Sequence, residues 1–126
     1  MSRQASFGEY LRKLRLDAGF GLRAFAETVG LKPSNLSRLE TGRMAPPMSA
    51  ERLTQIAEAL GLGEESPEFR KLNDLAAKAR PGTVAPDVAD YAARQSGVPL
   101  LLRTAKGKQL DEAEFRRLAE YIEEHF

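Results

Sequence analysis

Hydrophobic side chains recur every three or four positions along most of the chain, which is the spacing of one face of an α-helix. No stretch alternates apolar and polar residues as a half-buried strand does. The clearest patterns predict helices over about 7–18, 22–29, 33–41, 50–60 and 67–79. Further helices are predicted over about 87–94, over about 99–106 and from residue 112 onward. The sequence therefore predicts an all-α protein.

Residues that commonly begin and end helices stand at several of these boundaries. Ser6 and Glu9 have the spacing of a capping box, and Ser49 can cap the fourth helix. Gly30 and Gly42 follow the second and third helices, where a left-handed residue ends a helix most easily. Pro81-Gly82-Thr83 is the best candidate for a linker, and it predicts domains over 1–80 and 81–126.

The segment 22–42 reads as two short helices joined by a glycine-bearing turn, the geometry of a helix-turn-helix. We expect Leu31, Leu36 and Leu39 to hold the second of these helices on the core. Short polar or cationic side chains then remain on its outer side, which suits a helix in a DNA major groove. A purely structural exposed helix more usually carries Glu/Lys pairs. The outward residues are Lys32, Pro33, Ser34, Asn35, Ser37 and Arg38.

The amino-acid composition argues against several kinds of catalytic and metal-binding protein. The 126 residues include no cysteine and one histidine, His125, so disulfides and thiolate metal sites are excluded and a histidine metal centre is not expected. We predict no catalytic residues, no metal and no cofactor. The net charge of +1 is uneven, because residues 1–63 hold nine basic and six acidic residues, whereas residues 64–126 hold ten and twelve. This asymmetry fits an anionic partner for the first half, and it equally fits chance.

No segment predicts a membrane span or a secretory signal. The longest unbroken apolar run, Val98–Leu102, is far shorter than the roughly 20 residues that cross a bilayer. Met1–Gln4 leads directly into a charged amphipathic stretch rather than an apolar one. We therefore expect a cytoplasmic protein that does not enter a membrane.

Residues 7–62 resemble the lambda-repressor-like, XRE-type helix-turn-helix family of bacterial and phage transcriptional regulators. The resemblance implies a five-helix DNA-binding domain that acts as a homodimer on an inverted repeat in double-stranded DNA, and we expect a repressor. A small helical dimerisation region would follow this domain. Four segments carry the resemblance: LRKLRLDAG (Leu11–Gly19), FAETVGL (Phe25–Leu31), SNLSRLETG (Ser34–Gly42) and ERLTQIAEALGL (Glu51–Leu62).

The resemblance also implies roles for individual residues. Its base-contacting positions are occupied by Ser34, Asn35, Ser37 and Arg38. Arg38 is the best candidate for a bidentate contact with guanine, although a phosphate contact or a solvated charge is the alternative. Asn35 could pair with adenine or satisfy donors at the helix N-terminus. The family's phosphate-contacting positions are occupied by Arg23, Lys32 and Arg43, for each of which a solvated surface charge is an equal alternative.

Arg15 matches an arginine that, in this family, pairs with the glutamate ending the recognition helix, here Glu40. A phosphate contact by Arg15 is the alternative. Two departures from the family pattern weaken particular DNA contacts. Gly21-Leu22 stands where a polar pair ending in glutamine usually holds a phosphate, and Pro33 can offer a base only an apolar contact.

Val98–Glu124 resembles, less specifically, short helical extensions of such regulators. One helix face cannot bury all of Leu100, Leu101 and Leu102, and together with Phe115, Leu118 and Ile122 they predict a surface shared with a second copy. Packing back onto the first domain is the alternative. A different function is also open, in which an antitoxin-like or protease-controlled module uses this half to bind a toxin or a regulatory protease.

Overall fold

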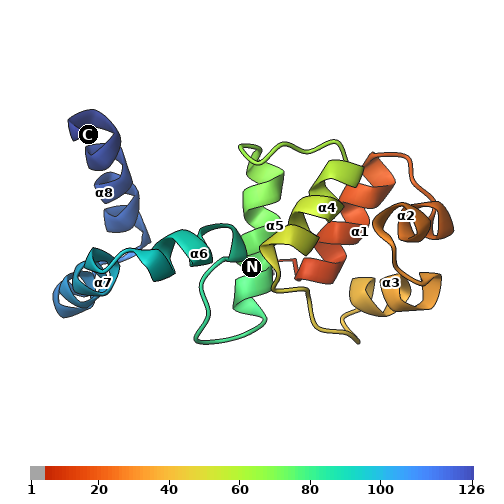
Figure 1. Cartoon of the computed structure of the whole chain (residues 1–126), viewed down its shortest axis with the longest axis horizontal. Helices are drawn as coiled ribbons and strands as arrows, with labels where there is room; N and C mark the ends of the chain where they lie inside the picture. The colour runs from red at the N-terminus through yellow and green to blue at the C-terminus, as the bar shows by residue number, and fades with distance from the viewer. Residues whose placement is uncertain (1–4) are drawn as a thin grey trace. The chain divides into compact units, whose positions relative to one another are not determined.

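The computed structural model describes residues 5–126, and over that range the regular structure consists of α-helices alone, eight in number (Figure 1). The all-α prediction is confirmed. The largest difference from the predicted bounds is at α7, which begins before Pro99 because proline is tolerated in the first turn of a helix. The helices are α1 (Phe7–Asp17), α2 (Leu22–Val29), α3 (Pro33–Glu40), α4 (Ala50–Ala59), α5 (Pro67–Lys78), α6 (Pro86–Arg94), α7 (Gly97–Lys108) and α8 (Glu112–His125).

No helix within residues 5–126 is long and apolar enough to cross a membrane. The expectation that the chain lacks a secretory signal rests partly on Met1–Gln4, which lies outside the described residues.

The chain forms two compact units, of which the first ends at Asp90 and the second spans Tyr91–Phe126. The boundary expected at residue 80 thus lies inside the first unit. Residues 81–83 form a turn rather than a linker, and the Thr83 Oγ1 hydroxyl donates to the Arg80 carbonyl at 2.6 Å. The chain then returns to α5, where the buried Asn73 Oδ1 accepts the backbone N–H of Asp87 at 3.0 Å. A Pro-Gly pair signals a turn but does not tell whether the chain packs back afterwards.

The hydrophobic core of the first unit is built by α1 to α5. Helix α1 packs against α3 and α5, and α2 packs against α3 and α4 (Figure 1). Ala18 follows the last turn of α1 and is exposed. The largest fully buried apolar side chains are those of Leu11, Phe25, Leu36, Leu39, Leu53, Ile56 and Leu72.

The beginning of α1 meets the end of α3 so closely that only glycine fits between them. A Cβ atom at Gly8 would lie 2.7 Å from the Glu40 carbonyl oxygen and closer still to that of Leu39. Both neighbours are backbone atoms, which cannot turn aside as a side chain can. Gly8 therefore fixes how near α3 lies to the core.

We predict that Gly8→Ala lowers the free energy of unfolding by about 1–3 kcal/mol, the usual effect of overpacking. Gly63→Ala is the matched control, because a Cβ there would meet no atom within 4 Å. Urea denaturation of the two variants measures the difference. Equal stabilities for the two variants would show that α3 does not depend on this close approach.

Candidate nucleic-acid interface

The turn between α2 and α3 has the geometry of a helix-turn-helix. Gly30 ends α2 in the left-handed conformation, with φ of 73°, which glycine adopts without strain. The backbone N–H of Leu31 then donates to the Ala26 carbonyl at 2.8 Å and closes the turn. Ala26 is fully buried, so its small side chain lets the helices approach. The turn thereby sets the direction in which α3 leaves the core.

Helix α3 has one buried side and one exposed polar side. Leu36 and Leu39 are buried in the core. Ser34, Ser37 and Arg38 are exposed, and their spacing of three and four residues puts them on one helix face. Asn35, the fourth residue expected to contact bases, is only half exposed and lies towards the buried side. The polar groups on the face that a ligand can reach are therefore two hydroxyls and one guanidinium, beside the exposed Pro33.

The two helices of this motif begin differently from the other helices of the core. Helices α1, α4 and α5 start at Ser6, Ser49 and Ser66, whose hydroxyl oxygens each accept a backbone N–H at 3.2–3.3 Å. Each of these helices also has a glutamate in its first turn. Helices α2 and α3 start at Gly21 and Lys32, with no side-chain cap and no acidic residue in the first turn. Their N-terminal amides can therefore take an anionic oxygen from outside the chain.

The three residues expected to contact phosphates are exposed and lie at helix ends. Arg23 is the second residue of α2, Lys32 is the N-cap of α3, and Arg43 follows α3 by three residues. The backbone N–H of Arg43 donates to the Arg38 carbonyl at 2.8 Å, so the chain turns back on the end of α3. Arg23 and Lys32 thus stand beside the two helix N-termini that have no side-chain cap.

A buried ion pair holds the end of α3 against α1. Arg15 Nε donates to Glu40 Oε2 at 2.7 Å, and a second guanidinium nitrogen donates to Oε1 at 3.0 Å. The third nitrogen donates to the Phe20 carbonyl at 2.9 Å, in the loop between α1 and α2. The hydrogen bond to Glu40 raises the pKa of Arg15. These are the two residues that the sequence analysis expected to pair, and their burial takes the Arg15 guanidinium away from a phosphate.

Sequence reasoning missed two features of the first unit. The first is Asn73, which is fully buried and whose side-chain amide joins α5 to the start of α6. The only signal for it in the sequence is a polar residue beside the apolar positions of α5.

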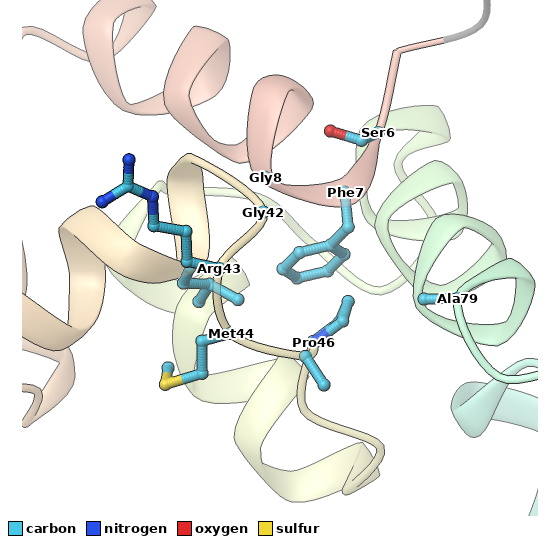
Figure 2. Close-up of a pocket in the computed structure, with 10 residues that line it drawn as sticks. Ser6, Phe7, Gly8, Gly42, Arg43, Met44, Pro46 and Ala79 are labelled. Carbon is cyan, nitrogen blue, oxygen red and sulfur yellow. The ribbon is translucent and has the colours of Figure 1, made fainter.

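The second is a cavity of about 400 Å³ behind the end of α3. It lies between the start of α1 and the loop that carries Arg43, and the sequence does not predict it. Figure 2 shows the Phe7 ring between that loop and Ala79, while the Arg43 guanidinium points away. The cavity brings no cluster of polar groups together.

The six residues expected to form a dimer surface lie in the second unit. Five of them, Leu100, Leu101, Leu102, Phe115 and Ile122, are exposed, and Leu118 is half exposed. A groove of about 490 Å³ runs beside them and is lined by Leu102, Ala105, Lys106, Gln109, Leu110 and Phe115. This apolar surface has no cover within its own unit.

Comparison with known proteins agrees with this geometry. Residues 6–68 match the family model described as a helix-turn-helix domain. The match covers the whole of α1 to α4 and half of the chain, so the chain belongs to the helix-turn-helix domain family. Such domains are typical of DNA-binding regulators. Neither curated proteins nor solved structures provide a match to the chain.

We predict that Glu40→Ala lowers the free energy of unfolding by about 3–5 kcal/mol, because it leaves the buried Arg15 charge without its partner. The matched control is Asp17→Ala, which breaks the exposed Lys13–Asp17 pair of 2.8 Å and should change stability little. Chemical denaturation monitored by circular dichroism measures both variants. A Glu40→Ala variant as stable as Asp17→Ala would contradict a structural role for the pair.

Proposed function

We propose that this chain is a sequence-specific transcriptional regulator of the XRE type, and that it represses transcription as a homodimer on an inverted-repeat operator. One observation carries the proposal. Helix α3 is held from behind by Leu36, Leu39 and the Arg15–Glu40 pair, and it turns short polar and cationic side chains outward. A helix held in this way can enter a major groove without rearrangement.

The side chains on the exposed face of α3 contact the edges of the DNA bases. The Arg38 guanidinium can donate two hydrogen bonds to O6 and N7 of guanine. Ser34 and Ser37 are short enough to let the helix approach the base edges, and each hydroxyl can donate or accept. Asn35 contributes an adenine contact only from the edge of the interface, because it is half exposed.

Phosphate contacts fix the position of α3 on the duplex. The N-terminal amides of α2 and α3 have no side-chain cap, and a phosphate oxygen supplies the missing acceptor. Arg23, Lys32 and Arg43 add charge at the same helix ends. Backbone amides thereby replace the side-chain contact that Gly21-Leu22 cannot make.

Dimerisation gives such a small module its specificity. A two-fold dimer reads two half-sites about one helical turn apart, near 10 bp from centre to centre. The exposed apolar surface of the second unit supports this assembly. The protein then acts by occupying DNA in the bacterial cytoplasm and catalyses no reaction. The same surface would serve the second candidate function, binding of a toxin or a regulatory protease, and a monomeric purified chain would favour that alternative.

We predict that Arg38→Ala weakens binding to the specific operator by about tenfold to hundredfold, because one bidentate base contact is lost. Binding to random DNA should change much less. Arg70→Ala is the control, since Arg70 is exposed on α5, outside the helix-turn-helix segment. Fluorescence anisotropy on operator and scrambled duplexes measures the ratio. Equal losses on both duplexes would assign Arg38 to a phosphate instead of a base.

We predict that Leu101→Asp converts the dimer to monomers, because it places a charge in the apolar surface that the second copy covers. Leu16→Asp is the matched control, since Leu16 is 50% exposed on α1 and Leu101 is 46% exposed on α7. Sedimentation velocity at several concentrations measures the masses. An unchanged dimer in the Leu101→Asp variant would place the interface elsewhere.

A further inference from the structure

Pro33 is an exposed residue of α3 to which the proposed function assigns no contact. It is the first residue of the helix, directly after the N-cap residue Lys32. Its ring has no group that forms a hydrogen bond, and the proline nitrogen carries no N–H. Pro33 therefore offers DNA neither a hydrogen bond to a base edge nor a backbone amide for a phosphate oxygen. What it offers is an apolar ring.

Helix periodicity places Pro33 on the side of α3 that faces away from the core. Side chains four residues apart lie one above the other, so Pro33 and Ser37 form one row, and Ser34 and Arg38 form the next. All four residues are exposed, whereas the two leucines of α3 are buried on the other side. Because the N-terminal residues of a recognition helix contact base edges, Pro33 belongs to the surface that enters the groove.

The neighbours of Pro33 allow its short ring to reach a base. The ring extends little beyond the helix backbone, so a contact requires a close approach of α3 to the DNA. Ser34 and Ser37 are short as well, and neither holds the helix away. Among the exposed residues of α3, Arg38 has the one long side chain, and it follows Pro33 by more than one helical turn. The ring also has no rotamers to order, so its contact costs no side-chain entropy.

A proline ring distinguishes the four bases by what their major-groove edges present. Guanine presents two acceptors, adenine an acceptor and a donor, and cytosine a donor. A polar group pressed against the ring gives up water and gains no partner, which is unfavourable. Thymine presents a methyl group beside its O4 acceptor. Contact between two apolar groups is therefore available to Pro33 at thymine and at none of the other three bases.

We propose that Pro33 contacts the methyl group of a thymine in each operator half-site and is thereby a specificity-determining residue. This inference rests on the proposed function and specifies one base of its operator. The hydroxyls of Ser34 and Ser37 can each donate or accept, so they accommodate more than one kind of base edge. The Pro33 ring accommodates one kind, because it cannot form a hydrogen bond.

Replacing thymine by uracil tests the contact, since it removes the methyl group and leaves O4 and the pairing with adenine unchanged. An operator selected from random duplexes is synthesised with uracil at one thymine position at a time, in both half-sites. Fluorescence anisotropy measures binding of the wild-type chain to each duplex. At one position the change should weaken binding about fifteenfold, because each lost methyl contact weakens it about fourfold and the dimer makes two.

The variant Pro33→Ser should bind the thymine and uracil operators equally. This ratio is measured within one variant, so a change in folded fraction or in overall affinity does not alter it. Pro67→Ser is the matched control, because Pro67 is also exposed and is also the first residue of a helix, α5, outside the helix-turn-helix segment. The control should keep the wild-type ratio.

Three results would overturn the inference: no thymine methyl that contributes to binding, a Pro33→Ser variant that keeps the wild-type ratio, or a Pro67→Ser variant that loses it. A wild-type chain that binds one sequence specifically and ignores every methyl group would leave the proposed function standing. A chain that binds all duplexes equally would overturn the proposed function together with this inference.

Discussion

The contact between the buried Arg15 guanidinium and the Glu40 carboxylate determines where helix α3 lies. Through its three nitrogens Arg15 joins the last residue of α3, the body of α1 and the loop before α2. Gly8 allows the two backbones to come close enough for this contact. Because the charges are taken out of water together, α3 cannot move away without stranding one of them. The outward presentation of Ser34, Ser37 and Arg38 depends on this arrangement.

In the rest of the motif, backbone N–H donors at the starts of α2 and α3 are available to an anion. Three core helices satisfy their first amides with a serine oxygen, but α2 and α3 do not. Water can satisfy these amides in the isolated chain, and under the proposed function a phosphate oxygen takes its place. The buried contacts behind α3 thus hold the helix in place, and the first backbone amides of α2 and α3 have no side-chain acceptor. In the second unit it is apolar side chains, rather than hydrogen-bond donors, that have no partner within the unit.

Periodicity predicted the helices well, because an apolar stripe and a terminal serine or glycine are both local signals. It did not predict the return of the chain onto α5, since the hydrogen bond between Asn73 and Asp87 joins residues fourteen positions apart. Residue types also located the outer face of α3, but periodicity treated Asn35 like its neighbours, whereas packing half covers it. The uncapped N-termini could have been read from Gly21 and Lys32, because neither has a side chain that accepts a hydrogen bond.

The central claim is that α3 of a two-fold dimer reads a DNA sequence. Selection of bound fragments from a random pool of duplex DNA, at a salt concentration that releases non-specific complexes, tests it most directly. The account predicts enrichment of an inverted repeat whose half-sites lie about 10 bp apart from centre to centre. A bound pool without a common sequence, or with a single half-site, would contradict it.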